Sequence, residues 1–198
     1  MKRLILASSN VGKLHELRSL LMGHHFHVIP QQVLGISDAE ETGLSFVENA
    51  ILKARHAASV GQEIAIADDS GLCVPALKGA PGIYSARYSG EHGNHAANNA
   101  KLLKAMEHVS YRYAYYVCVL AYVRHAEDPE PIIATGYWHG EIAREPRGKH
   151  GFGYDPLFWL PDLGKTVAEL ADEEKNQMSH RAKALSQLVH LLETHERV

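Results

Sequence analysis

The chain has 198 residues, of which 45% are apolar, 22% charged and 8% aromatic. This composition is that of an ordinary globular protein, and a chain of this length buries roughly 70% of its unfolded surface, so folding needs no disulfide or structural metal. The formal net charge of −3 argues against a nucleic-acid-binding protein, because such proteins carry a basic excess. We expect a single domain over residues 1–198, whose two lobes share one sheet.

The cysteines and the N-terminal residues bear on the cellular compartment in which the protein is expected. Cys73 and Cys118 lie in apolar runs without CxxC spacing, as expected of small core residues in a reducing environment. The apolar run of MKRLILASSN stops at Ala7, too early for a signal peptide or a membrane span. We therefore expect a cytoplasmic protein without membrane contact.

The first elements alternate in type. Lys2–Ala7 reads as a short strand, and Val28–Ile29 is a candidate for a second. Between them, leucines at helical spacing predict a helix that ends at Gly23: Leu14, Leu17, Leu20 and Leu21. A histidine cluster follows that helix: His24, His25 and His27. No second ligand group at a regular spacing supports a metal site there, so a solvated loop is favoured.

The second predicted helix begins after Thr42, which can cap it. Its apolar stripe consists of Leu44, Val47, Ile51, Ala54 and Ala58, and its opposite, polar face carries Ser45, Asn49 and Lys53. This spacing is typical of an amphipathic helix that covers a sheet.

A buried strand, Ile64–Ala67, then runs into two adjacent carboxylates, Asp68 and Asp69. Neighbouring like charges repel, and a buried carboxylate without a partner costs several kcal/mol. A protein cation or a metal ion must therefore compensate for them. We expect the strand to end at this pair, with Gly71 allowing the turn.

The remaining elements follow in mixed order. Residues 95–106 read as a helix, and three later runs read as strands: Tyr113–Val123, Ile132–Trp138 and Glu141–Arg144. Thr166 and Glu169 form a capping-box pattern. Ser179 can cap a final helix with the stripe Leu185, Leu188, Val189 and Leu192. Interspersed strands and helices indicate an α/β class with a mixed, partly antiparallel sheet.

The first strand–loop–helix unit could bind phosphate. Its polar loop and first helical turn comprise Ser8, Ser9, Asn10, Val11, Gly12 and Lys13. Free N–H groups and the helix dipole at a helix N-terminus favour an anion. The segment is not a Walker A loop, because Lys13 is followed by Leu14. A polar strand-to-helix turn without a ligand explains it equally well.

A second acidic pair, Glu40 and Glu41, precedes the second helix. Alone it fits a capped, solvated helix start. Together with Asp68 and Asp69 it could hold a hard cation, since Mg²⁺ takes one or two carboxylates with waters and phosphate oxygens. Because adjacent strand residues point to opposite faces, one aspartate of its pair should face the metal.

The motif GFGYDP places aromatic residues between glycines: Phe152, Gly153, Tyr154 and Asp155. Such a loop can stack a flat base, although a tight turn with its aromatics in the core fits as well. Beyond it, Lys175 and the SHRAK stretch place His180 and Arg181 at a helix start. Positive charge there opposes the helix dipole and suggests a bound anion.

The chain resembles the inosine triphosphate pyrophosphatases of the RdgB type. The matching stretches, in the family's order, are SSNVGK (8–13), EETGLSFVENAILKA (40–54), ADDSGL (67–72), GAPGIYSARYSG (79–90), GFGYDP (151–156) and SHRAKAL (179–185). One departure is Ser9, where many members have glycine. The resemblance implies an elongated α/β fold with its site in a cleft between two lobes, and a homodimer. It also implies Mg²⁺-dependent hydrolysis of ITP, dITP and XTP to the monophosphate and pyrophosphate, which keeps deaminated purines out of DNA and RNA.

The resemblance also implies residue roles. Residues 8–13 would hold the triphosphate, Glu41 and Asp69 the metal, with Glu40 and Asp68 nearby. Asp69 would also accept a proton, and Ser70 would contact substrate. The base pocket would comprise Phe152, Gly153, Tyr154, Asp155, Lys175, His180 and Arg181. Lys13, Lys53 and Arg181 would stabilise the leaving pyrophosphate, and His180 or Arg181 would donate to the base oxygen at C6.

Two other classes of protein compete with this hypothesis. A phosphatase with an aspartyl nucleophile would need a second Asp two residues after Asp68, where Ser70 stands. A non-catalytic nucleotide- or RNA-binding module would gain nothing from four carboxylates unless it held a metal.

Overall fold

The computed structural model describes residues 2–21 and 26–195. Of the histidine cluster, His24 and His25 therefore lie outside the described residues, whereas His27 is an exposed residue of strand β2. Within the described ranges, every helix is too short or too polar to cross a membrane.

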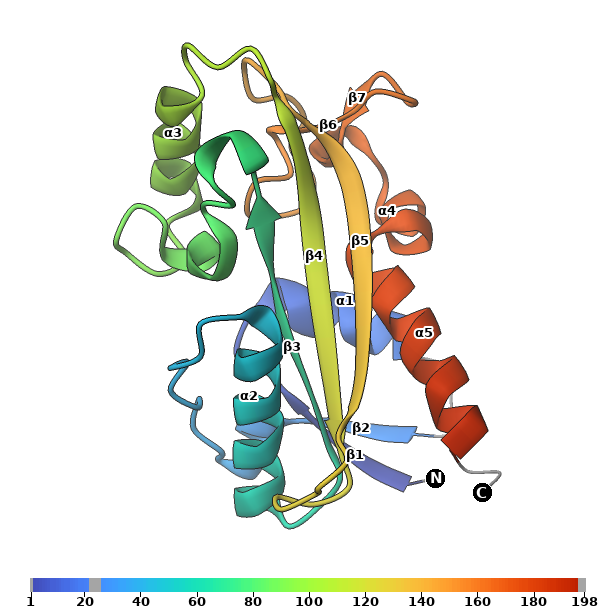
Figure 1. Cartoon of the computed structure of the whole chain (residues 1–198). Coiled ribbons are helices and arrows are strands. Elements are labelled where there is room, and N and C mark those ends of the chain that lie inside the picture. Colours follow the sequence, from blue (N-terminus) through green and yellow to red (C-terminus); the bar gives the residue numbers. More distant parts are fainter. Residues whose placement is uncertain (1, 22–25, 196–198) are drawn as a thin grey trace. The chain divides into compact units, whose positions relative to one another are not determined.

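Seven strands form one sheet in the order β2-β1-β3-β4-β5-β6-β7 (Figure 1). They span β1 (Lys2–Ala7), β2 (Phe26–Pro30), β3 (Ala65–Cys73), β4 (Tyr113–Val123), β5 (Ile132–Ile142), β6 (Phe158–Leu160) and β7 (Lys165–Thr166). β1 pairs in parallel with β2 and β3, whereas β6 pairs antiparallel with β5 and β7. The predicted mixed α/β class is confirmed.

The α-helices are α1 (Val11–Leu21), α2 (Phe46–Gly61), α3 (His95–Ala105), α4 (Asp172–Met178) and α5 (His180–His195). The Thr166–Glu169 capping box is confirmed, although it begins a 3₁₀ helix, Val167–Glu169. The expected cap at Thr42 is wrong. Ser45 caps α2, because its extended backbone lets its side chain accept from the Glu48 N–H, and the Glu48 carboxylate returns to Ser45.

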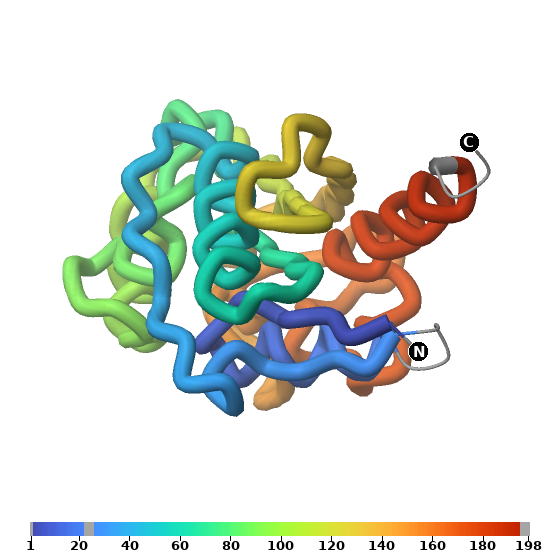
Figure 2. The backbone as a smooth tube through the Cα atoms, turned by 90° about the horizontal axis from the view of Figure 1, so that it is seen from below, coloured from blue at the N-terminus to red at the C-terminus, as the bar shows by residue number. Residues whose placement is uncertain are grey.

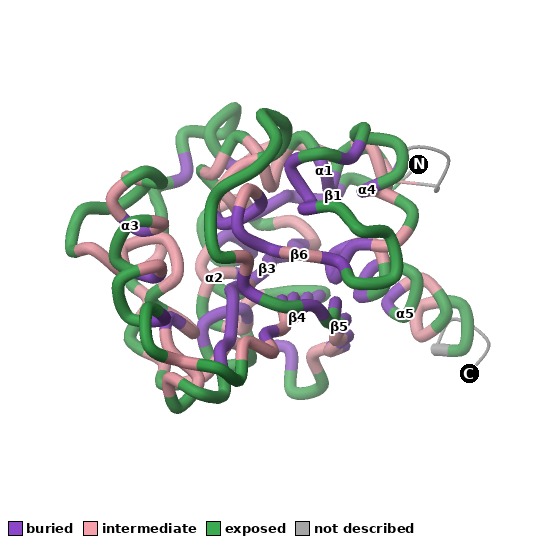
Figure 3. The backbone as a smooth tube through the Cα atoms, turned by 90° about the horizontal axis from the view of Figure 1, so that it is seen from above, coloured by how far each residue is buried: buried purple, intermediate pink, exposed green. Residues whose placement is uncertain are grey.

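The chain divides into two compact units. The first comprises Met1–Asp69, Cys118–Gly136 and Arg181–Val198, and the second comprises Ser70–Val117 and Tyr137–His180. The divisions fall inside β3, β4 and β5 and after the first residue of α5. Each unit has its own apolar cluster, and the buried residues concentrate on the strands while exposed residues gather in the loops (Figure 3).

The core of the first unit packs α1 and α5 against the strands, with Leu17, Leu185 and Leu188 buried as expected from the helical stripes. Helix α2 lies along β1 (Figure 2). Its predicted stripe is partly wrong, since Leu44 is 85% exposed and Val47 is also exposed. The helix instead buries small residues, Ala50, Ala54, Ala57 and Ala58, which allow close approach to the sheet.

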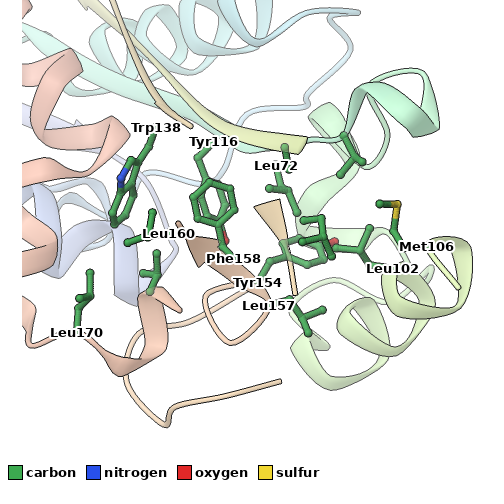
Figure 4. Packing of buried hydrophobic residues seen from close by; sticks show 14 residues of the cluster. Leu72, Leu102, Met106, Tyr116, Trp138, Tyr154, Leu157, Phe158, Leu160 and Leu170 are labelled. Carbon is green, nitrogen blue, oxygen red and sulfur yellow. The ribbon is translucent and has the colours of Figure 1, made fainter. Parts of the chain in front are cut away.

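The core of the second unit gathers aromatic and aliphatic side chains from β3, β4, β5, β6, α3 and the loop before β6. Figure 4 shows Tyr116 and Phe158 in contact, with Trp138 on one side and Tyr154 near Leu102 and Leu157 on the other. These side chains hold the segment around residue 154 against α3.

Two strand predictions need correction. β3 does not end at the aspartates but continues through them to Cys73, and both carboxylates are buried within it. The predicted strands Ile132–Trp138 and Glu141–Arg144 are one strand, β5, which runs without a break through His139 and Gly140. In both places the sequence signals a turn, but pairing with neighbouring strands satisfies the backbone and carries the strand onward.

Candidate functional site

Two buried carboxylates lie side by side in the middle of strand β3. Asp68 is 1% exposed and Asp69 5% exposed. Successive side chains of a strand point to opposite faces, and the two aspartates accordingly have different partners. Each must be compensated separately, which divides the charged residues of the first unit into two groups.

The first group surrounds Asp69. Lys53 of α2 places its Nζ atom 2.9 Å from Asp69 Oδ1 and 2.9 Å from Glu41 Oε1. Burial by itself would lower the pKa of Lys53, but the negative charges of Asp69, Asp68 and Glu41 outweigh it and raise this pKa. Lys53 is thus a permanent cation that holds two carboxylates around one point.

Asn49 completes this group, although sequence reasoning placed it on the polar face of α2. It is fully buried. Its Nδ2 lies 3.4 Å from Asp69 Oδ2, and its Oδ1 accepts from the Gly43 N–H at 2.9 Å. Asn49 therefore ties Asp69 to the loop that carries Glu41. Its spacing of one helical turn from Lys53 was the sequence signal for this role.

The second group surrounds Asp68. Lys13 Nζ of α1 lies 3.1 Å from Asp68 Oδ2, and Arg181 Nη2 of α5 lies 3.6 Å from the same oxygen. Arg181 also forms an ion pair with Glu16, a buried residue of α1 that sequence reasoning missed. Arg181 is itself 2% exposed. In this structure its guanidinium contacts carboxylates, rather than lying open to a base as we had expected.

The pKa values of the two aspartates are shifted in opposite directions. Burial raises the pKa of both, but at Asp68 the positive charges of Lys13 and Arg181 outweigh burial and lower its pKa. At Asp69 burial prevails over the attraction of Lys53 and Lys13, and its pKa is raised. A neighbouring pair with separated pKa values is typical of sites in which one carboxylate handles a proton and the other carries fixed charge.

The start of α1 has the predicted polar loop. Asn10 Oδ1 accepts from the Lys13 N–H at 3.1 Å, and Ser8 Oγ accepts from the Asn10 N–H at 3.3 Å. Ser9 and Val11 are exposed, and Gly12 is half-buried. The loop thus presents the first turn of α1 to solvent next to the Lys13 ammonium, an arrangement that suits an anion.

The GFGYDP loop is built around Asp155 in the second unit. Asp155 Oδ2 accepts from the Phe152 N–H at 2.9 Å and from Lys175 Nζ at 2.7 Å. Its Oδ1 accepts from the Tyr116 hydroxyl at 3.3 Å. Lys175, 5% exposed, lies 4.6 Å from the centroid of the Phe152 ring. Asp155 and Lys175 therefore hold the loop and its aromatic ring in one shape.

Two aromatic assignments change with the structure. Tyr154 is not part of a stacking platform, because its ring is buried in the core and its hydroxyl donates to the Ser85 carbonyl at 2.8 Å. Phe152 is only half-buried. His180 stacks on Tyr116 with ring centroids 4.7 Å apart, and lies 6.4 Å from the Trp138 ring. The aromatic surroundings of His180 were not foreseen.

Two further candidate residues are Glu40 and Ser70. Glu40 is exposed at the loop before α2, and Ser70 is half-buried on β3. Over residues 2–21 and 26–195, no group of three or more His, Cys, Asp or Glu side chains could hold a metal ion. Four carboxylates from the two acidic pairs therefore do not converge. The two that do, Glu41 and Asp69, share Lys53.

The fold and these groups define an α/β protein whose buried carboxylates are held by lysines and an arginine. It belongs to the Ham1 family, whose model matches residues 4–191. A dITP/XTP pyrophosphatase of Acinetobacter baylyi is 56% identical over 201 residues, covering 98% of this chain and 95% of the relative. One from Escherichia coli K12 is 56% identical over 194 residues, covering 97% and 98%.

A solved structure agrees with the family assignment. That of a HAM1 protein from Coxiella burnetii matches with a TM-score of 0.91 and 49% identity, covering 98% of this chain and 100% of that one. The same open, mixed sheet is therefore the fold of both chains.

The free energy of unfolding should respond to the same substitution much more strongly at Asp68 than at Asp69. We expect Asp68→Asn to lower the free energy of unfolding at pH 7 by about 3–5 kcal/mol, because Lys13 and Arg181 lose a buried partner. We expect Asp69→Asn to stay within about 1 kcal/mol of wild type, because the raised pKa of Asp69 shows that its ionised form is disfavoured in the fold. Urea denaturation measures both values.

Acid titration supplies the control. The lowered pKa of Asp68 gives stability above its unfolded pKa that is lost as the pH falls toward the folded value. The deficit of Asp68→Asn should therefore shrink below about pH 4, the unfolded range. A deficit that is independent of pH would contradict the ion-pair explanation.

Gly151 and Gly153 form a matched pair for testing the loop. Both have left-handed backbone angles, with φ of 73° and 65°. A Cβ at Gly151 would collide with Asp155, whereas one at Gly153 meets nothing within 4 Å. We expect Gly153→Ala to cost about 1–2 kcal/mol from its backbone angle alone, and Gly151→Ala to cost clearly more, because Asp155 must move from Lys175. Equal losses in thermal melts would contradict the role of Asp155.

Proposed function

We propose that this protein hydrolyses non-canonical purine nucleoside triphosphates, ITP, dITP and XTP, to the monophosphate and pyrophosphate, and so prevents their incorporation into DNA and RNA. Two findings support this proposal. The chain belongs to the Ham1 family, and relatives named dITP/XTP pyrophosphatase are 56% identical to it over nearly the whole chain. The observation that carries the proposal is the convergence of Asp69 and Glu41 on Lys53. Asp68 directly precedes Asp69 in the sequence, and its pKa is lowered, whereas that of Asp69 is raised.

The donor set suits Mg²⁺ as the cofactor. Mg²⁺ prefers hard oxygen ligands and usually takes one or two carboxylates, completing its shell with waters and substrate phosphates. Glu41 and Asp69 would hold it, since their oxygens already gather around one cation. Asp68 is occupied by Lys13 and Arg181, and Glu40 is exposed. When bound, Mg²⁺ would neutralise phosphate oxygens and orient water.

The protein's own groups divide the remaining work. Asp69 accepts the proton of the attacking water, a role that its raised pKa favours because a base works best with a pKa closer to the operating pH. The N–H groups of residues 8–13 and the Lys13 and Lys53 ammonium groups bind the triphosphate and stabilise charge on the leaving pyrophosphate. Asn49 keeps Asp69 in place.

The base is held by the loop of Phe152 to Asp155. The half-buried Phe152 ring offers a face to the purine, while Tyr154, Asp155 and Lys175 keep the loop in shape. His180 can donate to the oxygen at C6 of hypoxanthine or xanthine, where adenine has an amino group. A contact between Arg181 and the base remains a prediction. Ser70 is also predicted to contact the substrate.

We also propose a cytoplasmic homodimer. Both cysteines are buried free thiols, in agreement with a reducing compartment. The dimer follows from the family resemblance, and sedimentation of the purified protein tests it.

The catalytic role of Asp69 is tested by Asp69→Asn. With ITP and Mg²⁺ we expect turnover to fall about 100-fold or more, the range for an acid–base group, while the protein stays folded. The assay follows pyrophosphate release before and after chelation of the metal. Glu40→Gln should lose less than about tenfold, because an exposed carboxylate contributes little. Near-full activity of Asp69→Asn, or release of inorganic phosphate instead of pyrophosphate, would contradict the proposal.

Base choice is tested by His180→Phe, which keeps a ring to stack on Tyr116 and Trp138 but removes its hydrogen-bond donors. We expect kcat/KM for ITP to fall about 10- to 100-fold, since unpaired groups cost about 1–3 kcal/mol. kcat/KM for ATP should change little, so the ratio between the two substrates narrows. If both substrates lose equally, His180 has a structural role and base reading belongs to another residue, with Arg181→Lys as the next variant.

A further inference from the structure

Helix α3 of the second unit contacts the GFGYDP loop through two residues one turn apart. Asn99 Nδ2 donates to the Gly153 carbonyl at 3.0 Å, and the His95 ring lies 6.5 Å from the Phe152 ring, centroid to centroid. Residues four apart lie on the same face of a helix. One face of α3 therefore lies beside two consecutive residues of the loop, Phe152 and Gly153. Neither of the two α3 residues belongs to the motifs discussed above.

The helix provides a firm support for this contact. Asn94 caps its N-terminus by accepting from the Ala97 N–H. Leu102, fully buried one turn beyond Asn98, packs in the core beside Tyr154 (Figure 4). Asn98 is also buried and donates to the Ala86 carbonyl. The position of Asn99 is therefore set by residues on both sides of it along α3.

Asn99 binds the Gly153 carbonyl, which the other side-chain hydrogen bonds of the loop described above do not involve. Asp155 holds the Phe152 N–H, and the Tyr154 hydroxyl is bound to Ser85. Between them, Gly153 has φ of 65° and an open space where a Cβ would be, so packing does not restrain it. Glycine reaches many backbone conformations. The Asp155 N–H closes a turn over Gly153 by donating to the Phe152 carbonyl at 3.3 Å, and Asn99 binds the Gly153 carbonyl itself.

The other end of the Asn99 amide argues against a purely structural role. Only the NH₂ group can face a carbonyl, so Oδ1 points away. That oxygen is buried and has no hydrogen-bond partner among the residues that the structure describes. A buried acceptor without a partner costs free energy, which an apolar side chain at position 99 would avoid. Features that oppose stability in this way are expected where a residue serves function.

We propose that Asn99 is a positioning residue for base binding: by holding the Gly153 carbonyl it presets the loop so that the Phe152 ring meets the purine. This inference rests on the proposed function. The residue acts through the loop and does not take part in the chemical step, so its loss weakens substrate binding and leaves turnover intact.

The experiment compares Asn99→Leu and Asn99→Asp with wild type in steady-state hydrolysis of ITP. Both variants lose the donor, and Asn99→Leu also removes the orphaned oxygen. We expect KM for ITP to rise about 3- to 10-fold, as for one lost hydrogen bond, and kcat to stay within about twofold. The thermal midpoint of Asn99→Leu should equal or exceed that of wild type. Ala100→Asp, at the neighbouring exposed position, controls for the added charge and should keep the wild-type KM.

The possible results separate the two proposals. A wild-type protein that hydrolyses ITP, with a wild-type KM in Asn99→Leu, would overturn the positioning role alone. So would a lower thermal midpoint in both variants with kcat and KM unchanged, because that pattern belongs to a structural residue. A wild-type protein without activity on ITP, dITP or XTP would overturn the proposed function, and this inference with it.

Discussion

The compensation of two adjacent carboxylates inside a buried strand is the constraint on which the first unit depends. Asp68 and Asp69 point to opposite faces of β3, and their direct ion-pair partners accordingly differ. Lys53 comes from α2, Lys13 from α1 and Arg181 from α5. Removing the Asp68 carboxylate would leave Lys13 and Arg181 without a buried partner, at a cost of several kcal/mol. The positions of three helices are thereby tied to one point of the sheet.

This arrangement also separates the chemistry of two identical side chains. The cations around Asp68 lower its pKa, whereas burial prevails at Asp69 and raises it. One residue becomes a fixed charge that holds Lys13 and Arg181, and its neighbour becomes a group that can take up a proton. Lys53 and Asn49 then fix the direction of Asp69. A reactive carboxylate results from its surroundings rather than from its residue type.

The GFGYDP loop follows the same principle with different means. Its two left-handed glycines make the backbone permissive, and side chains of the loop and of distant segments restore a single shape. Asp155, Lys175, Tyr116 and Asn99 each bind the loop or one another. Tyr154 contributes through burial, leaving Phe152 as the half-buried ring. These contacts give one shape to a loop that would otherwise sample many conformations, and such preorganisation would reduce the entropy lost if the loop binds the base as proposed.

The sequence by itself determined most elements and the chemical inventory, because hydrophobic periodicity and residue type are local properties. Strands β1 and β4 match their predictions, and the acidic pairs and the lysines were identified as candidates. Only the tertiary structure decided which charges meet. It extended β3 through the aspartates, moved the cap of α2 to Ser45, buried Tyr154 and paired Arg181 with Glu16, 165 positions away along the chain. Strand pairing and burial override local turn and stacking signals, and partners far apart in sequence leave no periodic trace.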